Sequence, residues 1–104
     1  MDDFEYINEL LPFYMPLLTT KQQQIVELYY FENNSLSEIA DNLLISRNAV
    51  YDTLKKSIKA VKKYEEILQL QKNFQKRMDA YQKLLSLDIS QVDEIVNELI
   101  IMED

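Results

Sequence analysis

The chain has 104 residues, a net charge of −7 and 47% apolar residues, a composition typical of one small globular domain and not of a disordered segment. It contains no Cys, His or Gly, which excludes disulfides, thiolate zinc sites, histidine general bases and glycine-rich phosphate loops, so we expect no enzyme, metal or cofactor. Because no apolar run reaches membrane-spanning length and the chain lacks a basic secretion signal, we expect a cytoplasmic protein without membrane insertion.

The first predicted helix begins at Phe4, and its apolar residues recur at helical spacing as far as Tyr14. Asp3 is a suitable N-cap for this helix. Pro12 lies inside the pattern and is expected to kink the helix or to start a new turn, because proline lacks the amide hydrogen that a helix uses. Pro16 restricts the residue before it and is expected to end the element.

A second helix is predicted to begin with a capping box, in which the side chains of Thr19 and Gln22 each bond the other's backbone amide. Its apolar residues continue to about Phe31. Asn33 and Asn34 are expected to end it, because Asn is the residue other than Gly that best tolerates the left-handed conformation at a helix end.

The next two predicted helices have the spacing of a helix-turn-helix. The first, short helix follows a capping box at 35–38, and the small residue Ala40 allows its partner to cross closely. The turn is predicted at 44–46, and Val50 of the second helix should be buried. Leu44 occupies the turn position that usually holds Gly, and a left-handed leucine costs about 1 kcal/mol.

The second of these helices carries most of the positive charge, because residues 47–64 contain six basic side chains and one acidic one. Insertion of its start into a DNA major groove would bring polar side chains to base edges and lysines to phosphates. A solvated basic face without a ligand remains an alternative, because Asp52 lies within that face and would repel phosphate. The candidate site comprises Ser46 at the helix start, Arg47, Asn48 and Tyr51 toward base edges, and Lys55, Lys56 and Lys59 toward phosphates.

Beyond this helix the apolar pattern shifts by about one residue, which predicts a bend or break within 63–66. A long helix is expected from about Glu65 to Leu85, and a last helix, capped at Ser90, to about Met102. We therefore divide the chain into a helix-turn-helix bundle at 1–64 and a C-terminal helical arm at 65–104. The arm has more apolar surface than the small core can cover, which predicts a homodimer.

Several short segments match known helix-turn-helix proteins. The matching residues are Leu18-Thr19, Lys21-Gln22, Leu28-Tyr29-Tyr30, Ser35-Leu36, Glu38-Ile39-Ala40, Ser46-Arg47, Ala49-Val50-Tyr51-Asp52 and Lys55. With them, the stretch 17–57 resembles the C-terminal promoter-reading domain of bacterial sigma factors. More closely, it resembles the YlxM-type helix-turn-helix family, whose genes lie beside those of the signal recognition particle.

This resemblance implies an all-α protein, with a helix-turn-helix bundle like sigma factor region 4 and a long C-terminal helical arm. It also implies a non-enzymatic, nucleic-acid-binding regulator within the signal recognition particle pathway, with DNA or the particle's RNA as ligand and the particle's GTPase as a further partner. Two alternatives stay open. One is a protein-interaction module that binds a partner GTPase without nucleic acid, and the other is a transcription regulator that reads a palindromic DNA operator.

Overall fold

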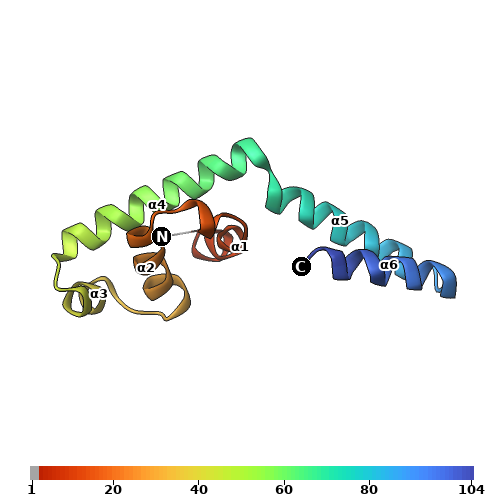
Figure 1. Cartoon of the computed structure of the whole chain (residues 1–104), viewed down its shortest axis with the longest axis horizontal. Coiled ribbons are helices and arrows are strands. Elements are labelled where there is room, and N and C mark those ends of the chain that lie inside the picture. The colour runs from red at the N-terminus through yellow and green to blue at the C-terminus, as the bar shows by residue number, and fades with distance from the viewer. Residues whose placement is uncertain (1–2) are drawn as a thin grey trace. The chain divides into compact units, whose positions relative to one another are not determined.

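The computed structural model describes residues 3–104, and all the regular elements in this part of the chain are helical, which confirms the predicted all-α class (Figure 1). The chain divides into two compact units, Met1–Gln69 and Leu70–Asp104. The elements in order are α1 (Phe4–Tyr14), a 3₁₀ turn η1 (Met15–Leu17), α2 (Thr20–Val26), a π-helical turn η2 (Glu27–Phe31), α3 (Leu36–Leu43), α4 (Arg47–Leu68), α5 (Leu70–Leu85) and α6 (Ser90–Met102).

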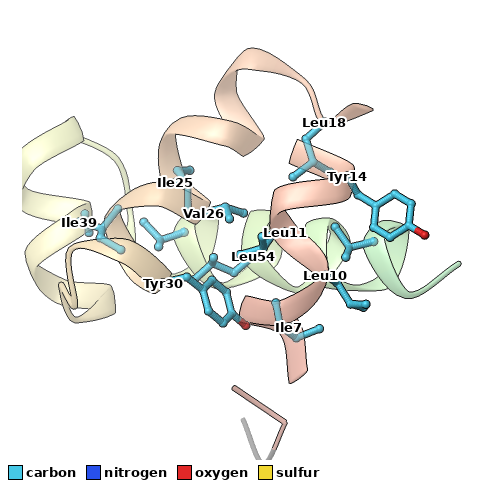
Figure 2. Close-up of a cluster of buried hydrophobic side chains, with 13 residues drawn as sticks. Ile7, Leu10, Leu11, Tyr14, Leu18, Ile25, Val26, Tyr30, Ile39 and Leu54 are labelled. Carbon is cyan, nitrogen blue, oxygen red and sulfur yellow. The ribbon is translucent and has the colours of Figure 1, made fainter. Parts of the chain in front are cut away.

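The first unit is built around α4, which packs against α1, α2 and α3. Figure 2 shows side chains from α1, α2 and α3 gathered beside Leu54 of α4. The helices α1, α2 and α3 are each too short to be stable alone in water, so most of their stability comes from the core that they share with α4. The buried residues of this core are Ile7, Leu10, Leu11, Tyr14, Leu18, Ile25, Val26, Tyr30, Ile39, Ala40, Val50, Leu54 and Val61.

The helix α1 continues through Pro12 as far as Tyr14, so the proline does not begin a new element there. The buried side chains of Leu11 and Tyr14 flank this exposed proline, and their packing compensates for the missing amide donor. The α-helix ends at Tyr14, close to the expected place, but the expected reason is wrong: Met15, before Pro16, keeps helical dihedrals, with φ −50° and ψ −45°. The chain continues as η1, and the backbone becomes extended only at Leu18.

The predicted helix caps at α2 and α3 are present. The Thr19 amide donates to Gln22 Oε1 at 2.9 Å, and the Gln22 amide donates to Thr19 Oγ1 at 3.1 Å. Ser35 and Glu38 make the equivalent pair at 3.0 and 3.1 Å. Asn33 has a φ of 56°, which confirms that an asparagine in the left-handed region ends the preceding helix.

The π-helical turn η2 was not foreseen from the sequence. The Glu32 amide donates to the Glu27 carbonyl at 3.1 Å, across five residues instead of four. The wider turn lets two consecutive tyrosines contact α1: the Tyr30 ring stacks on Phe4 with centroids 4.8 Å apart, and Tyr29 meets Phe4 edge-on at 6.1 Å. Burial raises the pKa of the Tyr30 hydroxyl, so this group stays protonated in the core.

The break predicted within 63–66 is wrong, because α4 continues to Leu68 and ends at Gln69, whose φ is 54°. The inward side of the helix is occupied at this point by Glu65, which is only 6% exposed. Its Oε1 accepts a hydrogen bond from the Tyr14 hydroxyl at 2.5 Å. A polar residue thus continues the buried side of α4, and the helix ends about one turn later than the apolar pattern suggested.

The second unit is an antiparallel pair of helices, α5 and α6. Only Val96 is buried among its residues, and half-buried apolar side chains from both helices surround it. At the open end, Arg77 Nε donates to Glu103 at 2.7 Å, and the Tyr81 hydroxyl donates to the same carboxylate at 2.8 Å. The predicted Ser90 cap is wrong: Ile89 occupies the cap position of α6 and makes no side-chain cap bond.

Candidate nucleic-acid interface

The turn between α3 and α4 has helix-turn-helix geometry without glycine. Leu44 lies in the left-handed region, with a φ of 56° and a ψ of 43°, and its amide donates to the Ala40 carbonyl. The amide of Ile45 donates to the same carbonyl at 3.1 Å. These two bonds satisfy the Ala40 carbonyl near the end of α3 and hold the leucine backbone in place. The Leu44 side chain is 90% exposed.

Ser46 fixes the start of α4, as predicted. Its Oγ accepts a hydrogen bond from the Ala49 amide at 3.0 Å, and its carbonyl accepts one from Val50 at 3.2 Å. The serine hydroxyl is therefore engaged as a cap, although its own hydrogen can still be donated to a ligand. The first turn of the helix is thereby fixed before any ligand arrives.

The inward side of α4 determines which residues face outward. Val50, Leu54 and Val61 have no exposed surface, so the opposite side of the helix must face solvent. At 100° per residue, Asn48 and Lys59 lie about 20° apart on that side, and Tyr51, Lys55 and Lys56 lie within about 60° of one or the other. Arg47, in the first turn, lies about 60° around the helix from Val50. All seven residues of the predicted site are exposed: Ser46, Arg47, Asn48, Tyr51, Lys55, Lys56 and Lys59.

The length of α4 determines how its residues can be used. At 1.5 Å per residue, Arg47 and Lys63 are about 24 Å apart along the axis. A B-DNA major groove is about 12 Å wide, so only the first turns of the helix fit between the phosphate backbones. Arg47, Asn48 and Tyr51 lie in those turns, whereas Lys55, Lys56 and Lys59 lie farther along the helix.

Two further lysines belong to this surface and are absent from the predicted site. An open hollow of about 470 Å³ runs along α4 and is lined by Lys55, Ile58, Lys59, Lys62, Lys63 and Glu66. The steps of four and three residues from Lys55 through Lys59 to Lys62 already indicated a shared side of the helix. We define the basic face of α4 by its exposed cations, Arg47, Lys55, Lys56, Lys59, Lys62 and Lys63.

Acidic groups limit this positive surface. Lys62 forms an ion pair with Asp3, and the hydrogen bond from Lys62 lowers the pKa of that carboxyl. Asp52 and Glu66 are exposed and flank the lysines on the same side of α4. The charges of these carboxylates weaken the attraction of the basic face for a phosphate group.

Residues 3–104 contain no group of three or more acidic side chains arranged to hold a metal ion. Over the same part of the chain, none of the helices has the length and apolar character needed to cross a bilayer.

Residues 1–99 match the family UPF0122, whose description reads "Putative helix-turn-helix protein, YlxM / p13 like". The chain is 44% identical to the UPF0122 protein YlxM of Bacillus subtilis over 81 residues, which are 78% of this chain and 74% of that protein. A UPF0122 protein of Staphylococcus epidermidis is 40% identical over 98 residues, covering 86% of this chain and 89% of its own length. One of Oceanobacillus iheyensis is 42% identical over 84 residues, covering 81% and 80%. The chain belongs to the UPF0122 family of YlxM/p13-like helix-turn-helix proteins.

Proposed function

We propose that this protein is a non-enzymatic regulator that binds nucleic acid through the basic face of α4. The observation that carries the proposal is the placement of this face: a capped helix, held by three neighbours, turns six cations toward solvent. Such a prepared surface loses little conformational freedom on binding. The proposal places the protein in the cytoplasm, where DNA and structured RNA are both present.

Phosphate contacts dominate the proposed interaction. Six cations outnumber the polar side chains near the helix start, and Asp52 lies among the residues that would approach base edges. Backbone contacts of this kind position a protein without reading sequence. The ligand we propose is therefore DNA or a structured RNA bound with modest sequence preference, and the RNA of the signal recognition particle is the candidate that the family resemblance suggests.

The test is a charge reversal on the face. We expect Lys55→Glu with Lys59→Glu to abolish binding to duplex DNA and to signal recognition particle RNA, measured by fluorescence anisotropy at one fixed salt concentration. The matched control is Lys76→Glu with Lys83→Glu on α5, which makes the same change in net charge at exposed positions of the other unit. Equal loss in both double variants would show a general charge effect and reject the assigned face.

Salt dependence gives a second measurement of the same contacts. Each phosphate contact contributes about −0.9 to the slope of log K against log salt for duplex DNA. Removing two contacts by Lys55→Gln with Lys59→Gln should make the slope shallower by roughly 2. An unchanged slope would mean that these lysines do not meet phosphates.

A protein partner is the second candidate, and one observation favours it. Leu44 places an almost fully exposed leucine two residues before Ser46, the cap of α4. Large exposed apolar residues of this kind contribute strongly to protein interfaces and little to phosphate binding. Under this alternative, a GTPase of the signal recognition particle binds this end of α4, and Leu44→Ser would weaken that complex while leaving nucleic-acid binding unchanged.

A further inference from the structure

The second unit, Leu70–Asp104, lacks the means to be stable by itself. Val96 is its only buried residue. Units shorter than about 40 residues usually need disulfides, a metal or association to stay folded. The chain has no Cys, and residues 3–104 contain no side-chain cluster that could hold a metal. Burial of more of its apolar surface against another protein surface would therefore add stability.

The exposed side of α6 carries an apolar row suited to association. Ile95, Leu99 and Met102 recur at steps of four and three and are 59%, 36% and 77% exposed. We call these three residues the α6 stripe. The side of α6 that faces α5 is a different one, centred on the buried Val96, and lies about 90° away around the helix. A helix with two apolar sides at this angle is typical of a four-helix bundle, in which each helix touches two neighbours.

The charges of the two helices determine which surface fits the α6 stripe. The α5 segment has four basic side chains and one acidic one, whereas residues 86–104 have six acidic side chains and no basic one. Glu94 and Glu98 are exposed on α6 beside the stripe. Two α6 helices placed side by side would therefore repel each other, and α6 placed beside α5 of another copy would be attracted.

We propose that two copies of this chain pair through their α5–α6 hairpins, with the α6 stripe of each copy packed beside α5 of the other. The same surface is used by both copies, so the pair closes with two-fold symmetry and does not extend into a filament. Leu84, Leu87 and Ile89 are also exposed at the closed end of the hairpin and enlarge the apolar surface available for burial. The pairing depends on the hairpin alone and would stand if α4 bound no nucleic acid.

The first experiment compares two substitutions of the same residue type on α6. We expect the unaltered chain to be a dimer of 12.4 kDa subunits by sedimentation velocity and light scattering. Ile95→Glu should weaken the dimer by at least about tenfold, because it would bury an unpaired charge. Ile101→Glu is the matched control: Ile101 is 71% exposed and lies about 130° around α6 from the centre of the α6 stripe, so the dimer should persist.

Circular dichroism of each variant checks its helical content. A variant that dissociates with unchanged helical content has lost the contact and has not unfolded. A dimer that survives Ile95→Glu would overturn the assigned surface. A chain that stays monomeric up to its solubility limit would overturn the pairing itself.

The second experiment tests the charge arrangement. Glu94→Gln with Glu98→Gln removes acidic groups beside the α6 stripe without changing its apolar side chains. If α6 lies beside α5 of the other copy, the dimer should become several-fold weaker, and added salt should reduce the difference from the unaltered chain. A stronger dimer would show that α6 faces α6, because repulsion would have been relieved, and would overturn the proposed arrangement.

Discussion

Leu44 shows how a helix-turn-helix can be made without glycine. Its backbone adopts the left-handed conformation that most residues avoid, and its side chain gains almost nothing from packing because it is 90% exposed. The two hydrogen bonds to the Ala40 carbonyl maintain the turn in spite of this cost. The left-handed backbone of Leu44 therefore lowers the stability of the first unit, at a turn that lies next to the candidate interface.

Leu44→Gly should raise the free energy of unfolding by up to about 1 kcal/mol, because glycine has no left-handed penalty. The greater conformational entropy of glycine in the unfolded chain offsets part of this gain. The measurement is urea unfolding followed by circular dichroism. Leu44→Ala is the control, since alanine keeps the β-carbon that causes the penalty. An equal gain in the alanine variant would show that the exposed leucine side chain, and not the backbone, is the source.

Glu65 is the other residue whose role differs from that of its neighbours. Its carboxylate is buried and accepts a hydrogen bond from Tyr14, which joins α4 to α1. Tyr14→Phe should lower the free energy of unfolding by about 1.5–3 kcal/mol, the usual value for a hydrogen bond to a charged group. Tyr6→Phe removes an exposed hydroxyl from the same helix and should change stability by less than about 0.5 kcal/mol.

At the scale of elements, the caps of α2, α3 and α4 were predictable because their signals are local, whereas the predicted cap at Ser90 was wrong. Thr19, Ser35 and Ser46 each act through an amide within three residues, and Asn33 needs only its own backbone preference. The end of α4 was not predictable in this way. Its position depends on Glu65, a polar residue that is buried through contact with a helix more than 50 residues earlier in the chain.

The outward side of α4 was predictable from the periodicity of its apolar residues. Its inward apolar residues determine the exposed side, so the seven predicted site residues are all exposed. Lys62 and Lys63 follow the same periodicity and lie beyond Lys59, the last residue of the predicted site. The hollow that they line needs side-chain positions, which no periodicity supplies.

The hairpin of α5 and α6 should weaken in acid. Hydrogen bonds from Arg77 and then Tyr81 lower the pKa of Glu103 from its ordinary value of 4.5. A lowered folded-state pKa means that the stabilisation is complete above the ordinary value and is lost as the pH falls through the lowered one. NMR titration should show the Glu103 carboxyl with a pKa below its ordinary value, and Arg77→Met should raise that pKa back toward the ordinary value.

At the scale of the whole molecule, the two units differ in how much they bury. The first contains the entire core cluster of the protein, whereas the second buries Val96 alone. A fragment of residues 1–69 should therefore unfold cooperatively in urea, with a free energy on the order of 3–10 kcal/mol. A fragment of residues 70–104 at low concentration should show little helix. A non-cooperative transition for the first fragment would mean that its core needs the second unit.

The dual use of α4 has a practical consequence. One side of this helix packs in the core, and its exposed surface carries the cations. A polyanion that binds these cations only when the helix is folded must therefore also stabilise the core by mass action. At a hundredfold excess over its dissociation constant, such a ligand would contribute about 2.7 kcal/mol and raise the melting temperature by roughly 10 °C or more. A melting-temperature survey of oligonucleotides could thus find the natural ligand without any prior guess at its sequence.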